Sequence, residues 1–323
     1  SDLNPAEEEN RKRIVEIFIG TDRKAQAKSE MLELAELAEQ NHLPEKVEEY
    51  LLKVKDISPE DAEVSQSLAR LYEDKGDVEA ATAEYLRLSG LFIESEKFEN
   101  ATGVLQKVKE ISPDNTAARK KLINLYKQNN RKKEFLRESL DLAEVYLGQN
   151  NAEDAVKSCK AVSSFYSEDT ETRKEVANFL LDHDMGEEAL KEYNNIADIY
   201  LRADKFKEAL KICEIGLNVT PDHIPLIKSR IRAFRGLNKP REASDLYLRL
   251  AEIHGLRENQ EAREEACRNA IEISPEHTAA YNALIQLMKT LGRSAEAADM
   301  LAKLVKIHKK NDNLEGALEA DKE

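Results

Sequence analysis

The chain has 323 residues, of which 35% are charged, and it contains no tryptophan. Its 63 acidic and 49 basic residues give a net charge of −14, which argues against a general nucleic-acid binder because phosphate contact needs a cationic surface. The apolar runs are too short to insert into a membrane, and the polar first residues show no secretory signal. We therefore expect a cytoplasmic protein.

One sequence pattern recurs along the chain at a constant spacing. This spacing, which equals the distance in sequence from Pro59 to Pro113, is called the repeat period below. It is marked by a proline slot, with serine in the one copy that lacks proline: Pro5, Pro59, Pro113, Ser167, Pro221 and Pro275. A fixed period of this kind is typical of a solenoid, in which each repeat buries its apolar face only against its neighbours. We expect one array over residues 1–323, a piece of a longer protein, with copies at 5–58, 59–112, 113–166, 167–220, 221–274 and 275–323.

Each copy is predicted to form three helices, as the second copy illustrates. Ser58 and Pro59 suggest a helix start, with the Ser58 hydroxyl accepting from free amides and Pro59 in the first turn. Apolar residues then recur at helical spacing through three segments of about 15, 19 and 15 residues. No strand pattern is present, so the fold class is all-α with about eighteen antiparallel helices.

The first helix of every copy ends at a residue type that tolerates a left-handed backbone. The six residues in this slot are Asp22, Gly76, Asn130, Asp184, Asn238 and Gly292. Such residues commonly end a helix and let the chain turn back.

The second and third helices of each copy resemble the tetratricopeptide repeat family, a 34-residue helix pair. In the second copy the matching residues are Tyr85, Leu88, Ser89, Phe92, Ala101, Leu105, Val108 and Pro113. In the fifth copy they are Tyr247, Leu250, Ala251, His254, Arg263, Cys267, Ala270 and Pro275. The sequence departs from the family by an extra helix of about 20 residues between successive pairs. The resemblance implies a right-handed helical solenoid that binds proteins without catalysis.

Three helices per copy is an odd number, so the first helices of successive copies should alternate between two layers. Charge alternates with them. Residues 60–79 carry a balance of −5 and residues 114–133 a balance of +6, and residues 168–187 and 222–241 repeat the pattern with −5 and +5. We expect acidic first helices in one layer and basic first helices in the other.

Basic stripes on two of these helices are the candidate binding residues. One stripe is Lys228, Arg232, Arg235 and Lys239, whose spacing places them on one helix face. The equivalent stripe two copies earlier is Lys120, Asn124, Lys127 and Arg131, and Asn178 holds the corresponding place between them. In the family, Lys–Asn and Lys–Arg pairs on such helices clamp a terminal carboxylate. The resemblance implies an acidic protein or peptide partner; the alternative is a solvated or internally paired face.

The remaining residues give no catalytic or metal site. Cys159, Cys213 and Cys267 follow one another at the repeat period, which predicts core packing and free thiols. The six histidines form no metal-ligand motif; His223 and His277 share a slot that predicts a helix-start role. No Ser-His-Asp arrangement or phosphate loop can be singled out. We expect no enzyme activity, no cofactor and no metal.

Three functions remain open. The leading one is a non-catalytic scaffold that holds partner proteins or peptides on its helix faces. The alternative is a structural spacer or self-associating array within a larger protein, favoured by apolar residues Leu314, Ala317 and Leu318 of the expected last helix, and it predicts a homo-oligomer. The third is a module whose associated chemistry lies outside this sequence.

Overall fold

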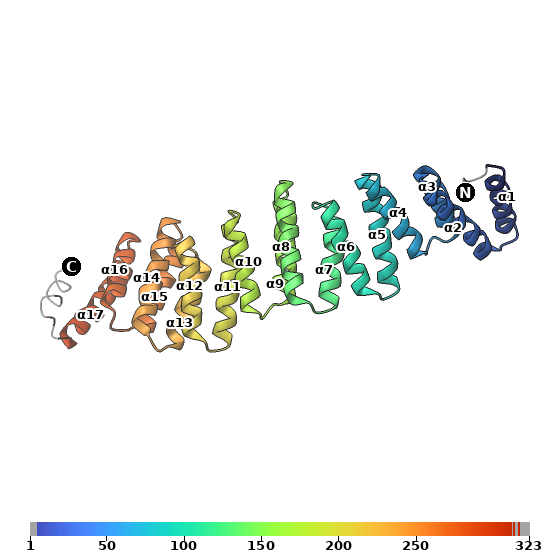
Figure 1. Cartoon of the computed structure of the whole chain (residues 1–323). Coiled ribbons are helices and arrows are strands. Elements are labelled where there is room, and N and C mark those ends of the chain that lie inside the picture. Colours follow the sequence, from blue (N-terminus) through green and yellow to red (C-terminus); the bar gives the residue numbers. More distant parts are fainter. Residues whose placement is uncertain (1–4, 312, 314–315, 317–323) are drawn as a thin grey trace. The chain divides into compact units, whose positions relative to one another are not determined.

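The computed structural model describes residues 5–311, 313 and 316, and these residues form α-helices joined by short turns, without a strand (Figure 1). The described helices are α1 (Pro5–Gly20), α2 (Lys24–Gln40), α3 (Pro44–Ile57), α4 (Ala62–Asp74), α5 (Val78–Glu94), α6 (Phe98–Ile111), α7 (Thr116–Gln128), α8 (Lys132–Gly148), α9 (Ala152–Phe165), α10 (Thr170–Asp182), α11 (Gly186–Arg202), α12 (Phe206–Val219), α13 (Ile224–Gly236), α14 (Pro240–Leu256), α15 (Gln260–Ile273), α16 (Thr278–Thr290) and α17 (Ser294–Lys310). The predicted all-helical solenoid class is confirmed. The expected eighteenth helix, around Leu314, Ala317 and Leu318, lies outside the described residues.

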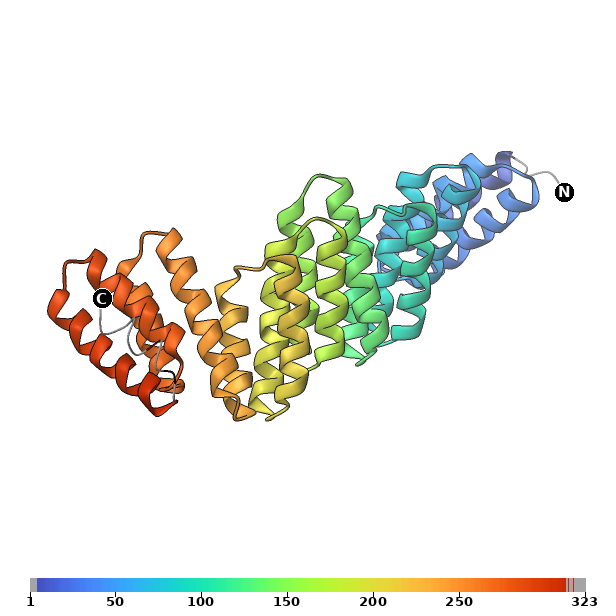
Figure 2. The same ribbon diagram turned by 90° about the vertical axis from the view of Figure 1, so that its left-hand side faces the viewer.

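The chain divides into two compact units, residues 1–162 and 163–323. Within each unit, consecutive helices run antiparallel (Figures 1 and 2). Helices two apart in the chain also touch, which makes two layers. In the first unit, for example, Tyr50 of α3 donates a hydrogen bond to Glu8 of α1, and Lys109 of α6 pairs with Glu138 of α8.

Consecutive first helices lie in different layers of a unit, as predicted. In the first unit, α4 lies beside α2 and α6, since Asp61 at its start pairs with Lys28 and Glu73 pairs with Lys107 at 2.7 Å. By contrast, α7 lies beside α5, where Lys121 reaches a backbone carbonyl. The acidic α4 and the basic α7 therefore occupy opposite layers.

The helix starts differ from the prediction. In the second copy α4 begins at Ala62, and its N-cap is Asp61, whose carboxylate accepts from the backbone amides of Glu63 and Val64. Ser58 is instead the C-cap of α3, and Pro59 lies in the turn between the helices. The prediction of Ser58 as N-cap is wrong because an ionised carboxylate three residues later satisfies the same free amides.

The helix ends follow the prediction closely. All six residues of the predicted slot have positive φ, from 53° at Asn130 to 74° at Gly76. A second series of left-handed residues ends the second helix of copies one to five: His42, Glu96, Asn150, Asp204 and Glu258. These turns bring each helix back against the previous one.

The three cysteines are core residues, as predicted. Cys159, Cys213 and Cys267 are free thiols with at most 1% exposure. Burial raises the pKa of Cys213 to about 12 and that of Cys267 to about 11, so both thiols stay protonated at neutral pH.

Candidate functional site

The basic stripe on α13 lies on the surface of the second unit. Lys228, Arg232, Arg235 and Lys239 are all exposed. Lys239 lies beyond the end of α13, at the N-cap of α14, so the prediction that all four share one helix face is wrong for Lys239. Arg232 donates to Asp198 of α11 at 2.6 Å, and Lys239 pairs with Glu242 at 3.1 Å. Within the described part of the chain, Lys228 and Arg235 have no ion pair. Half of the predicted stripe is therefore paired internally, and the other half is available to a partner.

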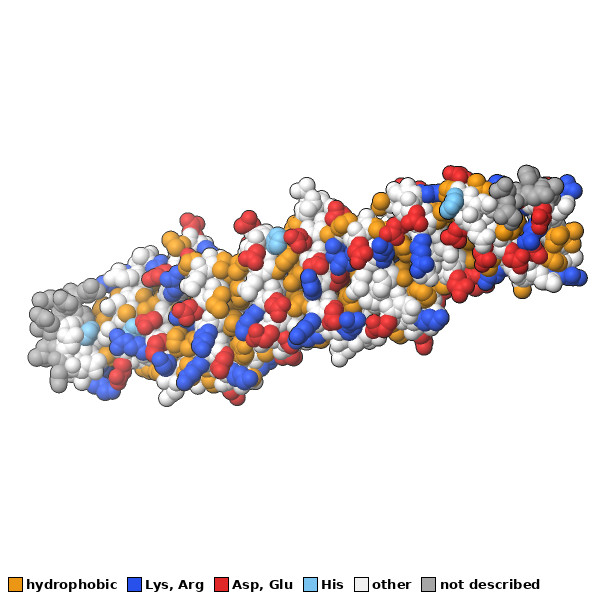
Figure 3. All heavy atoms as spheres, viewed as in Figure 1, with side chains coloured by type: hydrophobic (Ala, Val, Ile, Leu, Met, Phe, Trp, Pro, Cys, Tyr) orange, Lys and Arg blue, Asp and Glu red, His pale blue; other side chains and the backbone are white. Residues whose placement is uncertain are grey.

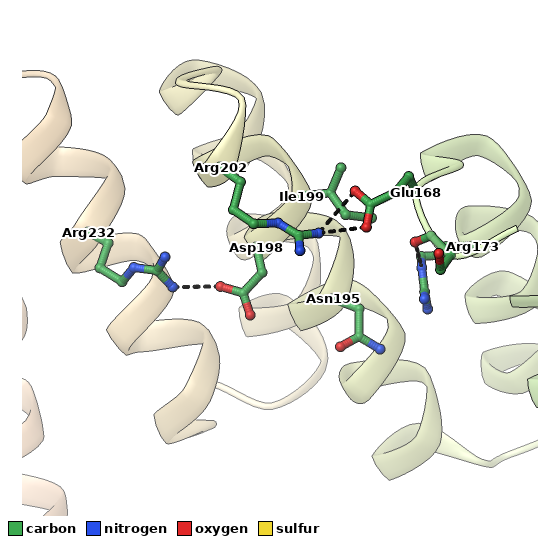
Figure 4. A pocket seen from close by; sticks show the side chains of 8 residues that line it. Glu168, Arg173, Asn195, Asp198, Ile199, Arg202 and Arg232 are labelled. Atoms are coloured by element: carbon green, nitrogen blue, oxygen red, sulfur yellow. Dashed lines mark hydrogen bonds and ion pairs between the residues drawn. The ribbon is translucent and has the colours of Figure 1, made fainter. Parts of the chain in front are cut away.

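A polar pocket adjoins this stripe and has a volume of about 480 Å³ (Figure 4). It is lined by Ser167, Glu168, Arg173, Asn195, Asp198, Ile199, Arg202 and Arg232. Arg202 donates to both carboxylate oxygens of Glu168 at 3.0 Å. Arg232 lies on the other side of the pocket and donates to Asp198. Arg173 is paired with Glu192, which does not line the pocket. Two guanidinium groups and two carboxylates remain at the pocket wall, and their charges balance.

The same slot in the preceding copy, in the first unit, is more acidic. A pocket of about 510 Å³ there is lined by Asp114, Arg119, Asp141 and Glu144 among others. These positions correspond by the repeat period to Glu168, Arg173, Asn195 and Asp198. One arginine faces three carboxylates, so this pocket has a net negative charge, whereas the charges at the pocket beside α13 balance.

The stripe on α7 is more fully engaged than the stripe on α13. Lys120 lies 5.5 Å from the ring centroid of Tyr146. Arg131 lies beyond the end of α7, at the N-cap of α8, so its predicted place on the same helix face is wrong. It bonds Glu134 at 2.8 Å, and this bond raises the pKa of the guanidinium group. Lys127 also has an interaction, whereas Asn124 is exposed. These contacts stabilise the fold and leave little free charge for a partner.

Asn178 of α10 is likewise occupied, because its side-chain oxygen accepts a hydrogen bond from the Tyr193 hydroxyl group at 3.0 Å. The α7 stripe belongs to the first unit, whereas Asn178 and the α13 stripe belong to the second. Of the two predicted stripes, the one on α13 combines free cations with an adjoining pocket, so α13 is the stronger candidate surface.

One arginine in each of copies two to five binds the backbone carbonyl at the proline slot. The bonds are Arg87 to Pro59, Arg119 to Pro113 at 3.0 Å, Arg173 to Ser167 at 2.8 Å and Arg249 to Pro221 at 3.4 Å. Arg119 and Arg173 come from the first helix of their copies, whereas Arg87 and Arg249 come from the second. The guanidinium group is thus supplied by either of two positions. Sequence reasoning missed this role, although the recurrence of Arg119 as Arg173 at the repeat period was a visible signal.

A buried carboxylate accompanies these arginines in copies two to four. Glu138, only 4% exposed, accepts from Arg119 at 2.8 Å and from Lys109 at 2.5 Å. Glu192 repeats the arrangement one copy later, where Arg173 and Ser163 bond it. In copy five the corresponding positions are Leu217, Ile227 and Leu246, which pack in an apolar cluster. The charged group therefore has a structural role that apolar side chains perform in another copy.

A Ser-His-Asp contact that the sequence did not single out joins α14 to the start of α16. The Ser244 hydroxyl group donates to the Ala270 carbonyl at 2.8 Å, and its oxygen lies 2.7 Å from His277 Nδ1. His277 Nε2 is 3.3 Å from Asp245. Because the hydroxyl proton goes to Ala270, the imidazole donates to the serine, which is the reverse of what a nucleophile requires. Ser244 is 0% exposed, so this contact ties helices together.

The two histidines of the predicted helix-start slot both lie at N-caps. His223 accepts from the Leu226 amide at 3.4 Å, as predicted. His277 makes no side-chain cap bond because Ser244 and Asp245 occupy its ring nitrogens. No cluster of three metal-binding side chains exists among the residues that the structure describes. Nor does any described helix combine the length and the apolar character needed to cross a membrane.

No curated protein matches the chain. Several solved structures resemble it at low identity. A crystal structure of MamA is 15% identical, with 69% of this chain and 96% of that chain covered and a TM-score of 0.22. The apo form of the quorum sensor NprR from B. thuringiensis is 14% identical, with coverages of 95% and 98% and a TM-score of 0.32. BtubC from P. vanneervenii is 14% identical, with coverages of 81% and 92% and a TM-score of 0.25.

Residues 244–277 match the tetratricopeptide repeat family model. The matched segment runs from Ser244 in α14 through α15 to His277 at the N-cap of α16. It contains the helix pair whose residues carry the family resemblance in the fifth copy, and its two helices pack as antiparallel neighbours (Figure 2). Residues 244–277 therefore form a tetratricopeptide repeat.

Proposed function

We propose that the chain is a non-catalytic scaffold for protein–protein interaction and that the α13 stripe holds acidic segments of partner proteins. The family supports the general role, since tetratricopeptide repeats typically bind proteins. The observation that carries the finer proposal is the pair Lys228 and Arg235, which are exposed and have no carboxylate partner among the described residues. They lie seven residues apart, or about 10 Å along the helix.

The pocket beside α13 also supports the binding of acidic segments. A carboxylate group of a partner that enters it would meet Arg202 and Arg232, whose present partners Glu168 and Asp198 are themselves at the surface. Exchange of one carboxylate for another costs little at such exposed ion pairs. The mixed surface visible in Figure 3, with acidic and basic side chains interspersed, indicates that specificity comes from local clusters of charge.

The test compares a labelled Glu-rich peptide with a Lys-rich peptide of equal length by fluorescence anisotropy. We expect saturable binding of the Glu-rich peptide, with an affinity that falls as salt rises. Reversing Lys228 and Arg235 to Glu should weaken binding by up to roughly 30-fold, at up to about 1 kcal/mol for each residue. The matched control reverses Lys207 and Lys211 of α12, two exposed lysines outside the pocket. Equal loss in both variants, or no saturable binding, would refute the α13 site.

A specific observation also favours self-association as a second candidate. Ile14 and Ile17 of α1 are 39% and 62% exposed, whereas Leu68, the residue equivalent to Ile14 in the next copy, is 0% exposed. Apolar surface of this kind favours a second copy of the chain. Sedimentation at two concentrations tests the proposal: a concentration-dependent mass that Ile17→Lys abolishes supports it, and an unchanged monomer mass removes it.

The three free thiols support a further proposal, that the chain works in a reducing compartment such as the cytoplasm. Thiol state after isolation from cells would test it, and disulfide-linked species among the isolated molecules would contradict it.

A further inference from the structure

A groove of about 870 Å³ in the first unit lies between α2 and α4, and α3 also contributes to its lining. Its apolar lining consists mainly of Ala35, Val47, Leu51 and Val64, each no more than 8% exposed. Leu32 and Leu71, from α2 and α4, are half-buried at its sides. The groove therefore presents aliphatic surface along the two helices that flank it.

Carboxylates dominate the rim of this groove. Asp61 and Lys75 are engaged, because Asp61 caps α4 and pairs with Lys28, and Lys75 bonds Glu48 at 2.5 Å. The other carboxylates have no ion pair within the described residues: Glu36, Glu39, Glu63 and Asp74. Arg70 is the one lining cation of the described chain in the same condition. Four unpaired negative charges against one positive charge leave a local balance of −3.

The equivalent groove of the next copy shows what this arrangement of helices accepts. There Lys121 of α7, which is the repeat equivalent of Ser67, extends to α5 and donates to the Leu86 carbonyl at 3.4 Å. Its ammonium group passes over Gly90, the residue equivalent to Glu36. A basic side chain thus crosses from α7 to α5, whereas the short Ser67 side chain does not reach across the α2–α4 groove.

A second internal comparison points to the same chemistry. In the second unit, Arg232 and Asp198 join α13 to α11 at 2.6 Å. By the repeat period these residues correspond to Arg70 and Glu36, which form no ion pair within the described chain. The α2–α4 groove is therefore not closed by the bridge that spans the equivalent helices in another copy.

We propose that the α2–α4 groove binds an amphipathic helical segment of a partner protein, with aliphatic residues on one face and Lys or Arg along its flanks. The aliphatic face covers the apolar lining, and the flanking cations meet the unpaired carboxylates. Helix α4 has 13 residues and spans about 20 Å, enough to accompany a segment of about four turns. This ligand has the opposite charge to the one proposed for α13, so each proposal can be refuted independently of the other.

The experiment measures binding of labelled helical peptides to the whole chain by fluorescence anisotropy. The main probe has Leu on one face and Lys on both flanks. A second peptide carries Glu in place of Lys, and a third carries Ser in place of Leu. We expect saturable binding of the Leu/Lys peptide alone, weakened by salt.

Three variants locate the site. Glu63→Gln with Asp74→Asn should weaken binding roughly 4- to 25-fold, at about 2- to 5-fold for each neutralised carboxylate. Ser67→Lys should weaken peptide binding further, because this substitution introduces the lysine that crosses from α7 to α5 in the next copy. The matched control is Glu79→Gln with Glu94→Gln, two exposed carboxylates of α5 outside the groove, which should leave affinity within about twofold.

Circular dichroism checks that every variant keeps its helix content, as expected for exposed sites. Any of the following results overturns the proposal: no saturable binding of the Leu/Lys peptide, equal binding of the Glu or Ser peptide, or an equal effect of the rim and control variants. Loss of binding on reversal of Lys228 and Arg235 together with an unchanged affinity in the rim variant would also overturn it, since the peptide would then bind the second unit.

Discussion

Glu8 ties α1 to α3 through a buried carboxylate. It is 8% exposed and accepts hydrogen bonds from Tyr50 at 2.5 Å and Lys46 at 2.6 Å, both on α3, while Lys12 lies at 3.0 Å. Burial by itself raises the pKa of this carboxyl group, but the bonds from Lys46, Tyr50 and Lys12 outweigh burial and lower it to about 2. The charged form therefore stabilises the docking of α1.

The substitution Glu8→Gln removes the charge while keeping the size of the side chain. The ordinary pKa of 4.5 and the folded value of about 2 differ by an amount worth about 3 kcal/mol, at ~1.4 kcal/mol for each tenfold change. We expect the free energy of opening α1 to fall by about this much. Since helices of a repeat array open locally, the loss should be confined to α1 and its contacts.

Amide hydrogen exchange at neutral pH measures this change. Exchange in α1 beyond its first turn should become roughly 100-fold faster in the Glu8→Gln chain, while exchange in α6 should stay the same. The control is Glu9→Gln, whose exposed pair with Arg13 at 3.5 Å is worth at most about 0.5 kcal/mol. Equal protection of α1 in the Glu8→Gln chain and the unsubstituted chain would refute the reasoning.

The same group gives a pH dependence of known direction. Because folding lowers the pKa of Glu8, its stabilisation is fully present above about pH 4.5 and is lost as pH falls from there towards 2. Carboxyl carbon chemical shifts should show Glu8 titrating near pH 2. A midpoint above 4.5 would contradict the proposed balance between burial and hydrogen bonding.

Three further predictions concern stability and reactivity. Glu138→Leu should destabilise the chain by about 3 kcal/mol in thermal unfolding, because buried Arg119 loses its closer counter-ion and keeps only the partly exposed Asp141 at 3.7 Å. The triple variant Lys109→Leu, Arg119→Ile and Glu138→Leu copies the apolar residues of copy five and should restore most of the loss; no recovery would contradict the equivalence of the two copies. Gly216→Ala should lower the free energy of unfolding by about 1–3 kcal/mol, since the added Cβ would lie 2.3 Å from a leucine methyl group. Gly103→Ala meets nothing within 4 Å and should raise it by about 0.5–1 kcal/mol. Changes of the same sign in both variants would be inconsistent with this packing. Cys267, whose pKa burial raises to about 11, should react with a thiol reagent at pH 8 far more slowly than in the denatured chain, and equal rates would show that the site is open.

The helix turns show how far sequence alone predicts this fold. Asp, Asn and Gly marked the end of each first helix correctly because these residue types tolerate positive φ. No such signal marked His42, Glu96 and Glu258, which adopt φ of 56°, 57° and 58°. There the packing of the next helix imposes a backbone that the side chain disfavours, so local propensity could not reveal it.

The candidate site was predicted less completely than the fold. The period identified the exposed stripe on α13, but it did not show that Arg232 is bound to Asp198, a residue of the preceding copy. Such a pair depends on the reach of two side chains across helices in the same layer. The pocket beside the stripe escaped prediction for the same reason, since Glu168 and Arg202 approach it from different parts of the chain.

The alternation of α4 and α7 between layers constrains how such a protein can grow. Duplication of one repeat copy adds an odd number of helices, so every helix downstream would move to the opposite layer of its unit. A ligand-binding face would then be interrupted at the point of insertion. Duplication of two adjacent copies keeps each downstream helix in its original layer, and an engineered extension of this array should therefore proceed in pairs of copies.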